Sequence, residues 1–157
     1  MRKRLIESIP QDIPAKNLTW LELENSVEVE MTSEDAEFPI ESALSSGSGS
    51  GWRAAIPGKQ TIRLLFEEPQ RLRRIRLSFV ESTADRTQEF VLRWSADGGR
   101  SFREIVRQQW NFKPNGSNSE IEDYEVDLAK VTTLELTIIP DINGRPEIAS
   151  LAELRLA

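Results

Sequence analysis

The sequence has no cysteine and no histidine. Without cysteine, the chain has neither a disulfide framework nor a thiolate metal site. Without histidine, it also lacks the side chain that most often serves as a general base and as a metal ligand. These two absences exclude most familiar catalytic devices, so we expect no enzyme activity and no cofactor.

Long apolar runs are also missing. The amino terminus, MRKRLIESIPQDIP, begins with basic residues as a signal peptide does, but only Leu5 and Ile6 precede Glu7 and Pro10. No apolar core of a signal peptide follows, and no stretch approaches the ~18 apolar residues of a membrane span. We therefore expect a soluble, cytoplasmic protein that does not enter a membrane.

The length of 157 residues corresponds to about one domain, at the usual ~150 residues per domain. Residues 45–51, SSGSGSG, look like a linker between two domains. The 44 residues before this tract hold about two strands, too few for an independent core. We interpret the tract as a loop, and predict an amino-terminal extension over residues 1–26 and a single β-sandwich over residues 27–157.

Charge is distributed unevenly around the net value of −6. Residues 1–52 hold ten acids and four bases, residues 53–107 seven acids and twelve bases, and residues 108–157 nine acids and four bases. An arginine-rich middle can bind phosphates, but pairing of opposite charges across neighbouring strands also accounts for it. We favour the second interpretation and expect no nucleic-acid partner.

Apolar residues alternate with a period of two along most of the chain, as in Ile75, Leu77 and Phe79. Such alternation is typical of half-buried strands. Turn-forming residues separate the alternating runs at 67–70 (EEPQ), 95–101 (SADGGRS), 113–118 (KPNGSN) and 140–146 (PDINGRP). The pattern predicts an all-β antiparallel sandwich or barrel. Only residues 37–44 look helical, for about a turn or two.

The connections between strands fall into two groups if each strand runs opposite to the one before it. The long connections then lie at one end of the sandwich, over residues 32–60, 81–88, 108–123 and 140–148. The short ones lie at the other end, over residues 67–71, 96–100 and 129–131. Long loops seldom persist without a use, so the long-loop end is the candidate binding face.

Three segments carry a resemblance to a known family. They are GWRAAIPGKQTIRLLFEEPQRLRRIRLSF, with a tryptophan before a strand, FVLRWSADGGRSFREI, with an Asp-Gly turn, and ASLAELRL at the carboxyl end. Together they resemble discoidin domains, the coagulation factor 5/8 type C family, over about residues 27–156. The resemblance implies a galactose-binding-like jelly roll whose members bind sugars, lipid head groups or proteins through loops at one end, without catalysis.

The chain departs from that family in two respects. Family members often bind a structural calcium through aspartates in the loop before the tryptophan, whereas this loop, SALSSGSGSG, has no acid after Glu41. We therefore expect no metal there. Many members are secreted and join their termini through cysteines, which are absent here. The residues WRAA followed by TI also resemble the amino-terminal jelly roll of a DNA single-strand-break repair scaffold, which supports an intracellular role through protein contacts.

The four tryptophans have different expected places. Trp52 and Trp94 belong in the core, because Trp94 shares its parity with Phe90 and the resemblance places Trp52 inside. Trp20 has the opposite parity to its apolar neighbours and can cover an outer face. Trp110 lies at the long-loop end, either as a surface that stacks on a sugar or anchors a partner, or as a lid over the interior.

Polar side chains at the same end can supply the donors and acceptors that sugar hydroxyls need. With Trp110, the candidate ligand-binding residues are Asp85, Arg86, Asn111, Asn115, Asn118, Asp141, Asn143 and Arg145. We expect the two arginines to orient the ligand and Trp110 to form an apolar floor. Any single asparagine or aspartate also suits a turn, so the hypothesis depends on their convergence.

Three classes of function stay open at this point. The family resemblance and the loop composition favour a non-catalytic carbohydrate-binding module. An intracellular protein-interaction or scaffold domain is the alternative. An enzyme would have to rely on carboxylates alone, as glycosidases do, but here the carboxylates lie mostly at outward positions of strands, such as Glu125 and Asp127.

Overall fold

The structure is a computed structural model that describes residues 1–5, 13–45 and 49–157. Its described strands are β1 (Val27–Met31), β2 (Trp52–Arg53), β3 (Gln60–Val80), β4 (Arg86–Ser95), β5 (Arg103–Phe112), β6 (Ser119–Ile139), β7 (Ser150–Leu151) and β8 (Glu153–Leu156). The described helices are a 3-10 turn, η1 (Ala15–Asn17), and one short α-helix, α1 (Glu41–Leu44). No helix within these ranges is long and apolar enough to cross a membrane.

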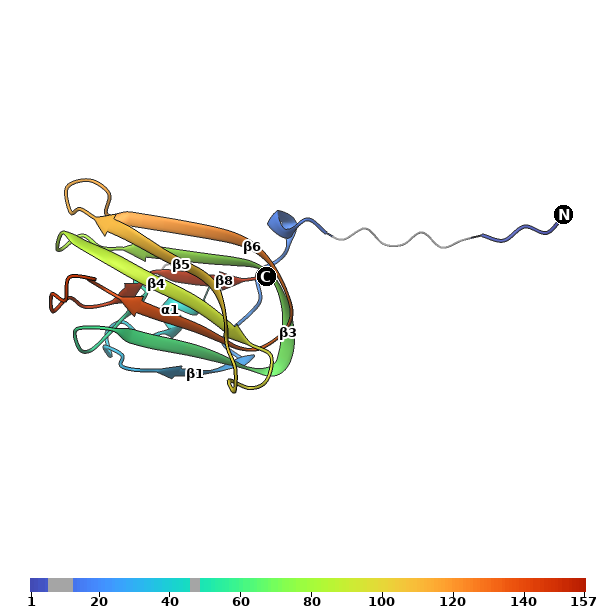
Figure 1. Ribbon diagram of the computed structural model, residues 1–157, viewed down its shortest axis with the longest axis horizontal. Helices are drawn as coiled ribbons and strands as arrows, with labels where there is room; N and C mark the ends of the chain where they lie inside the picture. Colours follow the sequence, from blue (N-terminus) through green and yellow to red (C-terminus); the bar gives the residue numbers. More distant parts are fainter. Residues whose placement is uncertain (6–12, 46–48) are drawn as a thin grey trace.

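Two long strands, β3 and β6, build both layers of the molecule. In one layer, the front sheet, the strand order is β1-β3-β6-β4-β5. Further along its length, β3 pairs with the first half of β6 and with β8, which forms the back sheet. All these pairings are antiparallel, and Figure 1 shows β3 curving from one layer into the other. The chain is an antiparallel jelly-roll β-sandwich, as predicted.

The core lies between the two sheets and follows the alternation of the sequence. The rings of Phe79 from the back sheet and Phe90 from the front sheet lie 5.2 Å apart, centroid to centroid. Trp52 is fully buried, which confirms its expected place. Trp94 also packs against the core but is only partly buried.

The structure corrects two predicted turns. Residues 67–70 and 129–131 are not loops, because β3 and β6 run through them without a break. The pairing of β3 with β6 instead shifts register between Leu65 and Gln70, where Pro69 cannot donate a backbone hydrogen bond. Such irregularities bend a strand, so the chain changes layer here without reversing. The helix predicted over residues 37–44 is also shorter, because α1 begins at Glu41.

The segment before β1 contacts the back sheet. The Leu21 amide donates to the Leu156 carbonyl at 2.7 Å, beside β8. The Trp20 ring lies under two arginines of β3, with the guanidinium carbons of Arg74 and Arg76 at 4.5 and 5.3 Å from its centroid. Trp20 thus covers an outer face of the back sheet, as its parity suggested. Residues 46–48 of the Ser/Gly tract lie outside the described residues.

Most arginines of the middle segment pair with acids on neighbouring strands. Asp123 of β6 joins Arg74 and Arg76 at 2.6 and 2.9 Å. Glu135, also on β6, joins Arg63 and Arg93 at 2.8 and 2.6 Å and is itself buried. The uneven charge along the sequence is therefore largely neutralised across the sheets, as expected.

The long connections meet at one end of the sandwich. In Figure 1, the loops over residues 54–59, 81–85, 113–118 and 140–149 project at the end opposite the bends of β3 and β6. Residues 96–102 connect β4 and β5 at the bend end. The long connections thus lie at one end, as predicted, because β3 and β6 each bend into the other layer and return toward the end at which they began.

Candidate functional site

A cavity of about 180 Å³ opens at the long-loop end. Three segments contribute to it: the start of β4, the end of β5, and the loop after β6. The lining residues are Asp85, Arg86, Thr87, Asn111, Phe112, Lys113, Asp141, Asn143 and Arg145. Six of the nine candidate residues from the sequence therefore surround one cavity, although they span 61 positions, from 85 to 145.

Asp141 holds the loop after β6 in shape. Its side chain is fully buried. Its carboxylate accepts hydrogen bonds from the backbone amides of Asn143 and Arg145, both at 3.3 Å, and from that of Thr87 at 3.5 Å. Burial alone would raise the pKa of Asp141, but these backbone N–H groups together lower it below its usual range. Asp141 is therefore an ionised anchor that fixes the loop against β4.

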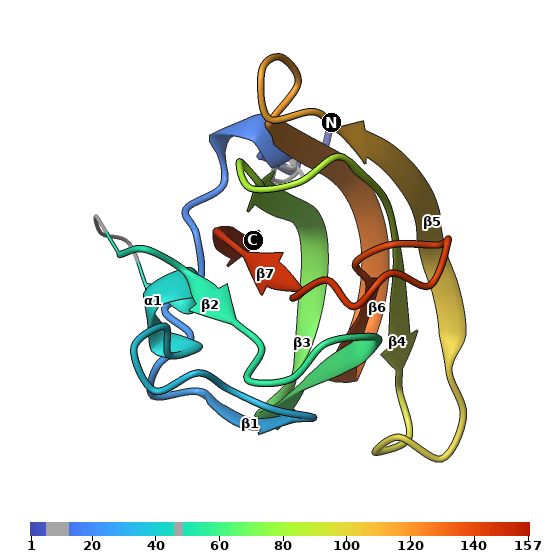
Figure 2. The ribbon, with the colours of Figure 1, turned by 90° about the vertical axis from the view of Figure 1, so that its left-hand side faces the viewer.

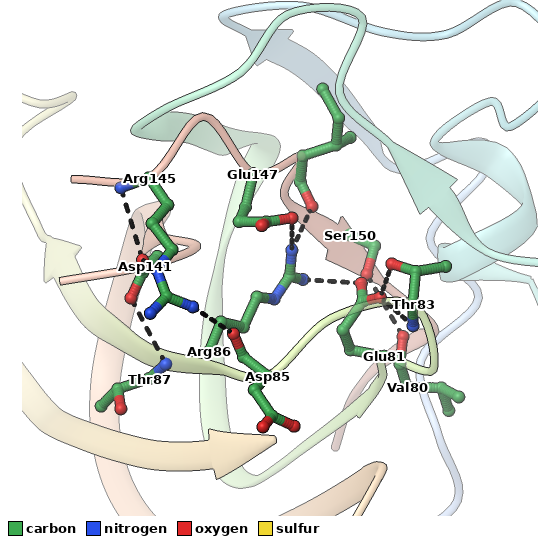
Figure 3. A network of polar contacts seen from close by, with 11 residues as sticks. Val80, Glu81, Thr83, Asp85, Arg86, Thr87, Asp141, Arg145, Glu147 and Ser150 are labelled. Atoms are coloured by element: carbon green, nitrogen blue, oxygen red, sulfur yellow. Dashed lines mark hydrogen bonds and ion pairs between the residues drawn. The ribbon is translucent and has the colours of Figure 1, made fainter. Parts of the chain in front are cut away.

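Arg86 and Glu81 form a buried ion pair behind the cavity (Figure 3). Their closest atoms, Arg86 Nη2 and Glu81 Oε2, lie 2.9 Å apart, and both side chains are at most 2 % exposed. Arg86 Nη1 also donates to the Ile148 carbonyl at 2.8 Å, and Glu81 accepts hydrogen bonds from the amide and hydroxyl of Thr83. Burial lowers the pKa of Arg86, which the nearby carboxylate of Glu81 opposes.

The structure therefore changes the role expected for Arg86. Its guanidinium points into the ion pair and not toward solvent, so it joins the loops before β4 and before β7. The sequence did not reveal this, because Glu81 lies in the connection over residues 81–88 and alternation does not show which side chains of a loop are buried.

Arg145 is the arginine that faces solvent at the cavity. Its side chain is 60 % exposed. Nη1 donates to the Asp85 carbonyl at 3.1 Å, and Nε lies 3.7 Å from Asp141 Oδ2 (Figure 3). These contacts fix the guanidinium plane, and Nη2 makes no hydrogen bond or ion pair with the described residues. Arg145 thus offers a donor whose direction is already set.

The remaining polar groups around the cavity include both donors and acceptors. Asn111 accepts a hydrogen bond from the Thr87 hydroxyl at 2.6 Å through Oδ1, which orients Nδ2 as a donor. Lys113 and Asp85 are exposed, and their charged groups make no ion pair with another described residue. Thr87 and Lys113 were not singled out in the sequence, although Thr87 follows Arg86 and Lys113 lies two residues after Asn111.

Trp110 lines a second cavity of about 320 Å³ that shares Asn111 and Lys113 with the first. The indole is half-buried against the core, and its Nε1 is buried without a hydrogen-bond partner among the described residues. Trp110 therefore acts mainly as a lid, while part of its ring borders the shared loop surface. Trp110 and Arg145 lie at the same end of the molecule, as the sequence argument requires.

Two candidate residues do not reach either cavity. Asn115 is exposed in the loop between β5 and β6, and Asn118 uses its carbonyl to accept the Glu81 amide at 2.8 Å. Both serve the turn, which is the alternative that their residue types left open. No cluster of three or more acidic side chains suited to a metal occurs in the described part of the chain.

Comparisons with known proteins bear on the fold. No family model and no curated protein matches the sequence. Solved structures do match, among them the family 32 carbohydrate-binding module of Clostridium perfringens NanJ in complex with galactose. It has 14 % identity and a TM-score of 0.62, and the match covers 86 % of this chain and 96 % of that one. The chain has the fold of family 32 carbohydrate-binding modules.

Two further structures of this fold contain other sugars. The module CpGH89CBM32-5, also from Clostridium perfringens, was solved with GalNAc-β-1,3-galactose; it has 20 % identity and a TM-score of 0.62, covering 88 % of this chain and 99 % of that chain. The family 32 module of AlyQ was solved with 4,5-unsaturated mannuronic acid, with 15 % identity and a TM-score of 0.60, covering 85 % and 95 %. The galactose-binding-like jelly roll expected from the sequence is confirmed.

Proposed function

We propose that this protein is a non-catalytic carbohydrate-binding module of the discoidin type, which binds its ligand at the cavity of the long-loop end. The observation that carries the proposal is the convergence of Asn111, from the end of β5, with Asn143 and Arg145, from the loop after β6, on that cavity. Sugar complexes of modules with the same fold support it. The cytoplasmic location stays a prediction from the sequence.

The side chains around the cavity suit hydroxyl groups, which both donate and accept hydrogen bonds. Arg145 and Asn111 supply donors that neighbouring residues have already oriented. Asp85 supplies an acceptor and Lys113 a further donor. Because the loop is held by Asp141, little ordering is needed when the ligand binds, which lowers the cost of binding. We expect modest affinity from a site of this size.

The carboxylates at the cavity support a non-catalytic role. Glycosidases need two carboxyl groups on either side of the bond that they cleave. Asp141 is fully buried and its oxygens accept backbone N–H groups, so among the residues that line this cavity only Asp85 presents an exposed carboxylate. A single exposed carboxylate binds a hydroxyl group but does not provide a paired acid and base.

A glycan array on the purified protein tests the proposal, with Arg145→Ala as the site variant. We expect selective binding by the wild type and at least a tenfold weaker binding by Arg145→Ala, because its fixed donors are lost. Arg71→Ala is the matched control: Arg71 is also a solvent-facing arginine in an ion pair, with Asp127, but lies at the bend end. Equal losses from both variants, or no glycan bound by the wild type, would contradict the proposal.

A protein-interaction domain remains the second candidate, and exposed apolar residues favour it. Ile56, Val80, Ile121 and Ile142 are each more than 40 % exposed, and all lie in loops or strand ends on the long-loop side. Large exposed apolar areas mark interaction sites on soluble proteins. If no glycan binds, a protein partner whose binding is lost in Ile142→Asp would establish this alternative.

A further inference from the structure

The strand β1 leaves one edge of the front sheet unpaired among the described residues. Two backbone hydrogen bonds on either side of β1 show which of its residues bond to β3. The Thr32 amide donates to the Thr61 carbonyl at 3.0 Å, and the Glu67 amide donates to the Ser26 carbonyl at 3.2 Å. In an antiparallel ladder, alternate residues bond to the same neighbour. The N–H and C=O groups of Val27, Val29 and Met31 therefore point away from β3, toward the free edge.

An apolar groove of about 250 Å³ runs along this edge, between β1 and α1. The half-buried Val27, Val29 and Met31 form one side of it, and Leu23 and Leu44 form the other. Figure 2 shows β1 at the rim of the sandwich, with α1 close beside it. An unpaired strand edge next to apolar pockets is the arrangement to which extended peptides add as an extra strand.

The segment that forms most of the groove is acidic. Residues 17–52 contain eight acids and no base. Glu24 and Glu41 line the groove, while Glu28 and Glu30 project from the exposed face of β1. None of these four carboxylates has an ion-pair partner in the part of the chain that the structure describes. The groove therefore suits an extended segment that carries both apolar and basic side chains.

The chain itself contains such a segment. Residues 1–5 read MRKRL, with bases at positions 2, 3 and 4 and apolar side chains at both ends. Met1 and Leu5 are almost fully exposed, and Figure 1 shows the segment leading away from the sandwich. At no more than roughly 3.5 Å per residue, the twelve residues before Ile13 can span about 40 Å. This reach is enough to meet a neighbouring molecule.

We propose that the groove beside β1 accepts the segment Met1–Leu5 of a second copy of this protein as an added strand. Alternate side chains of a strand share a face, so Met1, Lys3 and Leu5 enter the groove, where Lys3 meets Glu24 and Glu41. Arg2 and Arg4 then lie on the outer face beside Glu28 and Glu30. Reciprocal exchange of two such segments closes a twofold dimer and strengthens two weak contacts. This interface is separate from the long-loop cavity and does not depend on carbohydrate binding.

A charge exchange in the full-length chain tests this inference by sedimentation velocity. The first variant is Arg2→Glu with Arg4→Glu, and the second is Glu28→Lys with Glu30→Lys. We expect the wild type to dimerise with rising concentration, more strongly at 50 mM than at 500 mM salt, because the contact is between opposite charges. Each variant alone should be monomeric, since like charges then meet at β1. A mixture of the two should form a one-to-one dimer, because opposite charges meet again.

Hydrogen exchange tests directly whether the free edge of β1 is covered in the dimer, which a change in net charge alone would not cause. In the wild type, the amides of Val27, Val29 and Met31 should exchange at least tenfold more slowly at dimer-forming concentration than when dilute. Unchanged circular dichroism and unfolding temperatures in the variants establish that they are folded. The inference is overturned if the wild type stays monomeric at millimolar concentration, or if the Arg2→Glu/Arg4→Glu variant dimerises as the wild type does. It is also overturned if only a foreign basic peptide, and no second copy, protects these amides.

Discussion

At the scale of single residues, the sequence located the candidate site better than it assigned the roles within it. Asn111, Asp141, Asn143 and Arg145 were all singled out, because turn-forming polar residues concentrate in the long loops. Their roles depend on burial, which parity alone does not give for loop residues. Asp141 is an internal anchor, whereas Arg145 faces solvent at the cavity. The three-dimensional structure is needed to show which of these side chains is buried.

The ion pair between Glu81 and Arg86 gives a prediction about stability. We expect Glu81→Gln to lower the free energy of unfolding by about 3–5 kcal/mol, because the buried guanidinium of Arg86 then keeps only the more distant Glu147, at 4.0 Å, as an ion-pair partner. The matched control, Glu104→Gln, removes a carboxylate from an exposed pair with Arg107 and should cost at most about 1 kcal/mol. Urea unfolding of both variants measures the difference. Similar losses would show that the buried pair is not important for stability.

A buried carboxylate on β6 gives a prediction about pH. Glu120 is 3 % exposed, and neither oxygen has a hydrogen-bond partner among the described residues. Burial, together with Glu122, raises the pKa of Glu120 to about 8. The burial of Glu120 could have been predicted from the sequence, because Glu120 and Glu122 share the parity of the inward-facing Tyr124 and Val126. The outward positions of other carboxylates on the same strand obscured it.

The folded state therefore holds a proton on Glu120 that the unfolded state releases near its ordinary pKa. Stability should fall as the pH rises from about 4.5 to 8, because the unfolded state then binds fewer protons. We expect Glu120→Gln to remove at least about 1 kcal/mol of this loss between pH 5 and 9. Glu125→Gln, at an exposed position of the same strand, should leave the pH profile unchanged. Parallel profiles for the wild type and Glu120→Gln would refute the assignment.

At the scale of elements, alternation predicted the strands well and their boundaries less well. Inward rows such as Leu134, Leu136 and Ile138 are buried as expected. The sequence EEPQ was interpreted as a turn because proline favours turns, but here Pro69 lies in a bend of β3. A bend between sheets and a turn between strands contain the same residue types. Whether the chain bends or turns here depends on the pairing of β3 with β6 and β8. The local residue pattern contains no information about these distant partners.

The entry of the chain into β2 depends on a glycine. Gly51 has a φ of 81°, and a Cβ there would lie 2.5 Å from the Leu151 carbonyl oxygen and 2.8 Å from the Ala152 Cα. We expect Gly51→Ala to destabilise the protein by at least about 2 kcal/mol, from backbone strain plus displacement of β7. Gly58 also has a positive φ, of 93°, but open space around it. Gly58→Ala should therefore cost only about 1 kcal/mol, and equal midpoints in thermal unfolding would contradict this account of β2.

At the scale of the whole molecule, the assumption that successive strands run in opposite directions predicted the long loops at one end, even though two of the predicted turns were wrong. The prediction succeeded because a bend into the opposite layer carries the strand back along the sandwich, as a turn would. β3 and β6 therefore return to the end at which they began. The fold and the gathering of the long loops at one end thus follow from alternation and loop length. The free edge of β1 and its acidic groove could not be predicted from the sequence, because they depend on which strand lies at the edge of the sheet.

The most direct test of the central claim is a titration of the ¹⁵N-labelled protein with the best glycan from the array, followed by NMR. We predict that the amide shifts change at residues 85–87, 111–113 and 141–145, which line the cavity. Amides at the bend end, such as those of residues 96–102, should not move. Shifts centred on the back sheet or on β1, with none at the loop cavity, would contradict the account.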